Sequence, residues 1–154
     1  ESVEYLHKLV QSHSCSDCRI YRAESDGGIL QGIVKDRSIK PNNVLGACPP
    51  GGKESKNCPE WDKNCGCHGP IMTRGMVGWA GGGSGPDFFI DMYKAPAKFW
   101  ENQHTVWGEV SGEESFTAIN AIFALDKKDN GGMTMLDNPV ELTLSYSVES
   151  ERVD

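Results

Sequence analysis

The residue type with the most distinctive chemistry in this sequence is cysteine. The chain has six, an even number, and four of them fall in one polar stretch rich in Gly and Pro. This pattern is typical of disulfide bonds in secreted or lumenal proteins, although the pairing does not follow from sequence alone. The short spacing suggests that the first two close one small loop, and the other four would then tie down residues 48–67. The disulfide candidates are Cys15, Cys18, Cys48, Cys58, Cys65 and Cys67.

Two other kinds of cysteine site remain open. Cys15 and Cys18, together with the Cys65-x-Cys67-His68 run, offer thiolates and an imidazole for zinc, but the irregular second pair disfavours a metal site. A redox Cys-x-x-Cys needs a helix N-terminus to lower its thiol pKa, whereas this pair follows a predicted helix and precedes a predicted strand. We therefore expect disulfides, no bound metal, and a location in the secretory-pathway lumen or outside the cell.

Length and charge restrict the partners. The chain of 154 residues suits one domain, residues 1–154, and carries 15 Lys and Arg against 22 Asp and Glu, a net charge of −7. Nucleic acids and anionic membrane surfaces attract basic proteins, so neither is expected as a partner. No apolar run is long enough to cross a bilayer. There is no initiator Met and no charged-then-apolar leader, so we expect any targeting signal to lie upstream.

Hydrophobic periodicity predicts a mainly β protein with two helices. Val3, Leu6 and Val10 recur at helical spacing, which favours a helix over 2–12 with Ser2 as its N-cap, and a second helix is expected over 113–125. Alternating segments and turn signals predict strands over 18–24, 29–35, 71–80, 87–93, 105–110 and 140–146.

The predicted strands outnumber the helices, which favours a closed or nearly closed β structure with helices over its open ends. Residues 36–70 lose periodicity and are rich in Cys, Pro and Gly. A loop of this length in a compact domain is either functional or tied down, and its four cysteines favour the second explanation.

Four segments, in order, carry a resemblance to the cyclophilin-type peptidyl-prolyl isomerases. They are Tyr21-Arg22 with Ile29-Leu30-Gln31-Gly32, then Gly75-Met76-Val77-Gly78-Trp79-Ala80, then Gly85-Pro86-Asp87-Phe88-Phe89-Ile90, and His104-Thr105-Val106-Trp107-Gly108-Glu109-Val110. The resemblance runs from about residue 2 to 147, apart from the insert. It implies a closed eight-stranded antiparallel barrel capped by two helices. The family's first two strands have no counterpart here, so we expect them to lie upstream or to come from another segment. If they come from another chain, the protein would be part of a larger assembly.

The resemblance also implies a site and a chemistry. Arg22 would be the cation that donates to the prolyl nitrogen, and Gln31 would hold the substrate backbone or orient Arg22. The partners would be proline-containing polypeptide segments, and no cofactor is expected. The residues implied to form the proline pocket and its rim are Met72 or Met76, Asp87, Phe89, Phe99, Trp100 and His104, while Phe88 is expected in the core.

Some positions depart from the family pattern. Asp26-Gly27-Gly28 stands where the family has a pocket Phe, which leaves Ile29 or Leu30 to form that wall. Asp87 replaces the usual Gln and could pair with Arg22 in competition with substrate. These departures keep a second hypothesis open, a domain that binds proline-containing segments or serves as a scaffold without useful turnover.

Overall fold

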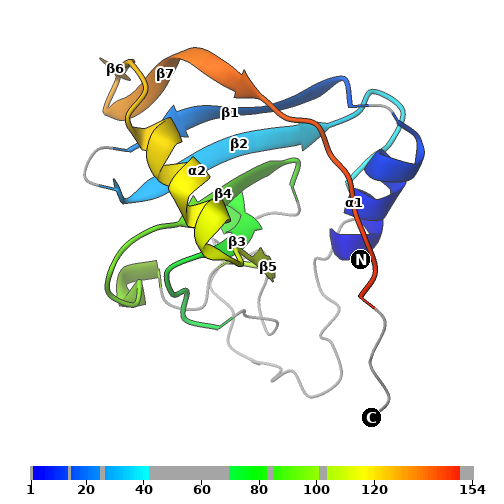
Figure 1. The fold of residues 1–154 in the computed structure, drawn as a ribbon, viewed down its shortest axis with the longest axis horizontal. Helices are drawn as coiled ribbons and strands as arrows, with labels where there is room; N and C mark the ends of the chain where they lie inside the picture. The colour runs from blue at the N-terminus through cyan, green and yellow to red at the C-terminus, as the bar shows by residue number, and fades with distance from the viewer. Residues whose placement is uncertain are drawn as a thin grey trace, which may run out of the picture.

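A computed structural model describes residues 2–13, 15–24, 27–41, 70–82, 85–100 and 104–149. The protein is mainly β, as predicted, with seven antiparallel strands in one curved sheet and two α-helices (Figure 1). The elements are α1 (Ser2–Gln11), β1 (Asp17–Ala23), β2 (Ile29–Lys35), β3 (Met76–Trp79), η2 (Ala80–Gly82), β4 (Asp87–Asp91), η3 (Lys98–Trp100), β5 (Val106–Glu109), α2 (Glu113–Phe123), β6 (Lys127–Asn130) and β7 (Met133–Glu141), where η marks a 3-10 turn.

The strands are ordered β5-β3-β4-β2-β1-β7-β6. Every pairing is antiparallel, and the hairpin of β1 and β2 lies near the middle of the sheet. The strands β5 and β6 end this order and are not paired with each other in the described ranges, so closure of a barrel stays a prediction.

One face of the sheet carries the main core. Alternate residues of the central strands are buried there because successive side chains of a strand point to opposite faces. The helix α1 adds Tyr5 and Leu9 to this core, and the Tyr5 hydroxyl donates a hydrogen bond of 2.6 Å to the Val34 carbonyl. The strands contribute Cys18, Ile20, Ala23, Leu30, Val34, Val77, Trp79, Phe88 and Ile90.

A β-bulge in β1 changes which residues reach the other face. Pairing with β2 is regular up to Ile20, skips Tyr21 and resumes at Arg22. A bulge places one extra residue against the partner strand and re-aims the side chains beside it. The burial pattern changes accordingly, because Tyr21 and Arg22 are both only partly buried between the buried Ile20 and Ala23. Two consecutive polar residues therefore lie on the outer face.

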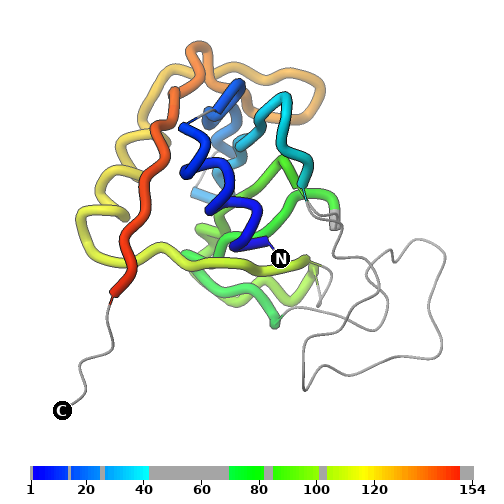
Figure 2. Tube along the Cα trace, turned by 90° about the vertical axis from the view of Figure 1, so that its right-hand side faces the viewer, coloured from blue at the N-terminus to red at the C-terminus, as the bar shows by residue number. Residues whose placement is uncertain are grey.

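The strand predicted at the C-terminal end has the wrong bounds. The strands β6 and β7 lie at 127–130 and 133–141, whereas the sequence pattern placed one strand at 140–146. Residues 142–149 run alongside α1 without being part of a strand, as Figures 1 and 2 show, and the rings of His7 and Tyr146 stack 4.7 Å apart. Their alternation reflects partial burial of Leu142 and Leu144 against the core. The Leu142 N–H still donates to the Cys18 carbonyl of β1 at 2.9 Å, but β7 itself ends at Glu141.

Other boundaries differ by smaller amounts. The strand predicted over 71–80 is shorter, since only Met76–Trp79 pairs, and the strand predicted over 87–93 ends at Asp91. Ser2 is the first described residue of α1, and its hydroxyl accepts a hydrogen bond of 2.9 Å from the Trp79 indole. Most of the insert predicted at 36–70 lies outside the described residues. No helix in the described ranges is long and apolar enough to cross a membrane.

Candidate functional site

A cavity of about 430 Å³ opens on the outer face of the sheet. One wall is polar and comes from the β1–β2 hairpin, and the other is aromatic and comes from β4 and the chain after it. The lining residues are Arg22, Glu24, Ile29, Gln31, Ala80, Gly81, Phe89, Tyr93, Trp100 and His104.

Strand register brings three of these residues into one row. Arg22 lies opposite Gln31 across β1 and β2, and Gln31 lies opposite Phe89 across β2 and β4. Directly opposed side chains of neighbouring strands have Cβ atoms about 5 Å apart. Segments separated along the chain therefore contribute an arginine, an amide and an aromatic ring to one line across the sheet.

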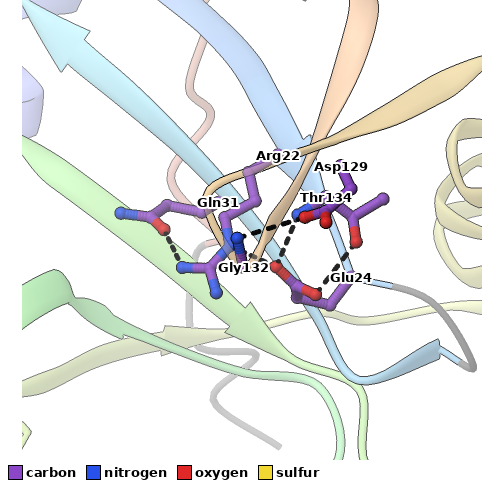
Figure 3. A network of polar contacts seen from close by, with 6 residues as sticks. All are labelled: Arg22, Glu24, Gln31, Asp129, Gly132 and Thr134. Atoms are coloured by element: carbon purple, nitrogen blue, oxygen red, sulfur yellow. Dashed lines mark hydrogen bonds and ion pairs between the residues drawn. The ribbon is translucent and has the colours of Figure 1, made fainter.

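The Arg22 guanidinium is held at two points. Its Nε donates to a Glu24 carboxylate oxygen at 2.7 Å, and its Nη1 donates to the Gln31 side-chain oxygen at 2.8 Å (Figure 3). Arginine has five N–H donors in a planar fork, so these two bonds leave further N–H groups for a ligand in the cavity.

The apolar part of the cavity is built around Phe89. Its side chain is only 4% exposed and belongs to a second small core with Met72 and Ala97. The rings of Trp100 and His104 meet it edge-on, at centroid distances of 5.2 Å and 4.7 Å. Edge-to-face contacts of this kind fix ring orientation, so the Phe89 ring forms a stable floor.

His104 is a neutral rim residue. Its Nδ1 lies 3.3 Å from the Trp79 carbonyl oxygen, which can only accept, so the neutral ring carries its proton on Nδ1. Burial lowers the pKa of His104 below its ordinary value, and this effect exceeds the opposing one of the hydrogen bond to Trp79. The ring is thus uncharged at neutral pH.

The expected site residues do not all reach the cavity. Arg22, Gln31, Phe89, Trp100 and His104 line it together. Met72 is 1% exposed and lies in the small core behind Phe89, and Met76 packs against that core. Phe99 is 65% exposed and contacts Tyr93 and Trp100 outside the cavity lining.

Two more specific expectations are resolved by contacts. Asp87 does not pair with Arg22, because its Oδ1 accepts a hydrogen bond of 2.9 Å from the Tyr21 hydroxyl. The bulge allows this contact, since it puts Tyr21 on the outer face beside Arg22. Of the two candidates for the missing wall, Ile29 lines the cavity and Leu30 is fully buried in the main core. Phe88 also lies in the main core, as expected, and is 6% exposed.

Sequence reasoning missed several lining residues. Glu24 follows Arg22 by two positions, and this spacing on one side of a strand was the available signal. Tyr93 packs closely over Gly28, where an added Cβ would lie 3.1 Å from the ring. Glycine at position 28 therefore leaves room for the Tyr93 ring, and Tyr93 lies in none of the four segments that carry the family resemblance.

Only the first part of the cysteine prediction falls on described residues. Cys15 and Cys18 form a disulfide pair with a Cα–Cα distance of 5.8 Å, as their spacing suggested. It joins the segment after α1 to the start of β1 and is compatible with an oxidising compartment. Cys48, Cys58, Cys65 and Cys67 lie outside the described residues. The described ranges contain no group of three or more His, Cys, Asp or Glu side chains that could hold a metal.

Comparison with known proteins found a similarity in structure only. No family model matches the sequence, and no curated protein matches it. Among solved structures the chain is similar to a cyclophilin-type peptidyl-prolyl cis-trans isomerase of Cryptosporidium parvum, solved in the presence of the dipeptide Ala-Pro. The TM-score is 0.43 and the identity 16%, covering 93% of this chain and 85% of that one. At this level the similarity carries no argument about activity, which has to rest on the cavity.

Proposed function

We propose that this cavity binds proline-containing segments of polypeptides and catalyses cis–trans isomerisation of the Xaa-Pro bond. The uncatalysed reaction is slow because amide resonance sets a barrier of roughly 18–20 kcal/mol. A catalyst must bind the twisted amide better than either planar form. It can do so by donating a hydrogen bond to the prolyl nitrogen, whose lone pair becomes available as the amide twists.

The observation that carries the proposal is that a cation and an aromatic pocket line one cavity. The N–H groups of Arg22 not used by Glu24 and Gln31 can donate to the prolyl nitrogen. Phe89, Trp100 and His104 offer an apolar hollow for the proline ring. Excluding water from this hollow strengthens the charged hydrogen bond. No cofactor or covalent intermediate is needed for a rotation about one bond.

NMR exchange spectroscopy on a short peptide with one Ala-Pro bond tests the proposal. Catalytic amounts of protein should produce exchange cross-peaks between cis and trans signals. Arg22→Ala should lower the catalysed rate on the order of 100-fold, the loss typical when a preorganised donor is removed. Arg19→Ala is the matched control, because Arg19 lies on the same strand, pairs with Asp17 at 2.8 Å and does not line the cavity. If the wild-type protein gives no exchange above background, the enzymatic proposal fails.

One observation favours the alternative of binding without turnover. The Glu24 carboxylate already pairs with Arg22 and offsets part of its charge. The same NMR samples distinguish the two functions, because a binding module would shift the peptide signals in a titration without adding cis–trans exchange. In either case we propose a lumenal or extracellular location, on the basis of the cysteines.

A further inference from the structure

The side chain that anchors Arg22 at its Nε is Glu24, which neither the motif resemblance nor the proposed function requires. Glu24 follows β1, and its backbone N–H closes the β1–β2 hairpin by donating to the Ile29 carbonyl at 3.0 Å. Its side chain is 21% exposed and lines the cavity beside Arg22. It is therefore placed at the edge of the site by the end of the β1–β2 pairing.

Both carboxylate oxygens of Glu24 are occupied. Oε1 accepts from the Arg22 Nε and from the Thr134 backbone N–H at 3.0 Å, and Oε2 accepts from the Thr134 hydroxyl at 3.2 Å (Figure 3). Burial raises the pKa of Glu24, but the bonds from Thr134 and Arg22 lower it further, so the net pKa lies below the ordinary value. The group is thus an ionised carboxylate with a fixed position.

The support for Glu24 comes from the β6–β7 hairpin. Thr134 is the second residue of β7, and the turn before it is closed by Asp129, whose Oδ1 accepts from the Gly132 N–H at 3.1 Å. Gly131 and Gly132 have φ values of 65° and 90°, which suit glycine and shape this turn. A segment 110 residues away from Glu24 along the chain thereby determines where the carboxylate sits.

We infer that Glu24, held by Thr134, is the positioning residue that fixes the plane of the Arg22 guanidinium toward the prolyl nitrogen. A planar fork held at one point can rotate, but Glu24 at Nε and Gln31 at Nη1 fix two of its edges. The remaining N–H groups are then oriented before the substrate arrives, so their ordering is not a cost of reaching the transition state. This inference rests on the proposed isomerase function.

The experiment compares Glu24→Ala and Glu24→Gln with the wild type. Glu24→Gln keeps a carbonyl oxygen for Arg22 and Thr134, so it should retain kcat within about threefold, whereas Glu24→Ala should lower kcat about 10-fold with little change in KM. Asp17→Ala is the matched control, because it breaks the pair between Asp17 and Arg19, which has the same two-residue spacing and likewise joins a carboxylate to an arginine Nε, but outside the cavity.

A second readout separates positioning from a structural effect. In the wild type the Arg22 Nε–H signal should be shifted and slow to exchange with water, and Glu24→Ala should abolish this while thermal unfolding shows that the variant is folded. The inference is overturned if Glu24→Ala leaves kcat unchanged or raises it, or if kcat falls while the Arg22 Nε–H signal is unchanged. If the wild type has no isomerase activity, the proposed function fails, and the Arg22 signal alone decides whether Glu24 orients the guanidinium.

Discussion

Gly32 is the position where the smallest substitution should have the largest structural effect. It lies in β2 opposite Ile20, just before the bulge that places Arg22 on the outer face. A Cβ at this position would lie 2.4 Å from the Arg19 carbonyl oxygen and 2.8 Å from the nearest atom of the Phe88 ring. Both distances are well short of ordinary van der Waals contact, and one of the two neighbours is backbone. Gly32→Ala must therefore push β1 away from β2 or displace Phe88.

The expected cost follows from the rigidity of these two neighbours. Phe88 is 6% exposed and packs edge-on against Trp107, so its ring has little room to move. Overpacking a well-filled core typically costs 1–3 kcal/mol and occasionally more, so we expect about 3 kcal/mol for Gly32→Ala. For a domain of this size, such a loss lowers Tm by roughly 10 °C.

Urea unfolding followed by tryptophan fluorescence and circular dichroism measures this loss. Gly108→Ala is the control, because Gly108 also lies in a strand but an added Cβ meets nothing within 4 Å. Relief of glycine's entropy cost should make that variant neutral or up to about 1 kcal/mol more stable. A Gly32→Ala protein as stable as the wild type, with the same denaturant slope, would refute the described packing of β1 on β2.

Three further outcomes follow from buried polar groups. Tyr5→Phe should lower the free energy of unfolding by about 1–3 kcal/mol in urea titrations, because it leaves the buried Val34 carbonyl without its donor. Burial lowers the pKa of His104, so the stability contributed by its neutral ring should be present above about pH 6.5 and be lost as pH falls toward the lowered pKa. Unfolding curves measured from about pH 7.5 to 5 should show the free energy of unfolding falling with pH, and His104→Asn should reduce this pH dependence. Asp91 is fully buried and its Oδ2 has no partner among the described residues, so burial raises the pKa of its carboxyl and the ionised form destabilises the protein at neutral pH. Asp91→Asn should therefore be more stable than the wild type at about pH 7. This difference should shrink as pH falls, because the wild-type carboxyl then takes up its proton.

Local patterns in the sequence were sufficient for the helices and for the central hairpin. The amphipathic spacing of α1 and the acidic first turn of α2 are properties of a few neighbouring residues, so they predict the elements well. The C-terminal end failed for a physical reason. Alternation reports that one face of an extended segment is buried, and Leu142 and Leu144 satisfy this just beyond the last residue of β7. The paired strands β6 and β7 carry few buried residues, so the pattern gave no signal for them.

The candidate site, too, could be predicted from the sequence only where local motifs mark its residues. Motifs supplied Arg22, Gln31, Phe89 and His104. Strand register brings the first three residues to one cavity, and His104 joins them through its ring contact with Phe89. The roles assigned to them stay predictions. Glu24 was not predicted as a site residue because its position depends on a contact with Thr134, which no local sequence pattern reveals. The choice between Ile29 and Leu30 likewise depends on which face each residue takes in the sheet.

The hydrogen bond made by Asp87 shows how the bulge in β1 affects the candidate site. A carboxylate at this position could neutralise the cation and compete with substrate. Because the bulge places Tyr21 beside Arg22, the Tyr21 hydroxyl binds Asp87 instead, and burial together with this bond raises the pKa of Tyr21 well above its ordinary value. The hydroxyl therefore stays a donor at any physiological pH, and Asp87 keeps its partner. Among the described residues the carboxylate that pairs with Arg22 is that of Glu24, at the Nε edge, so the opposite edge of the guanidinium is left to Gln31 and to a ligand.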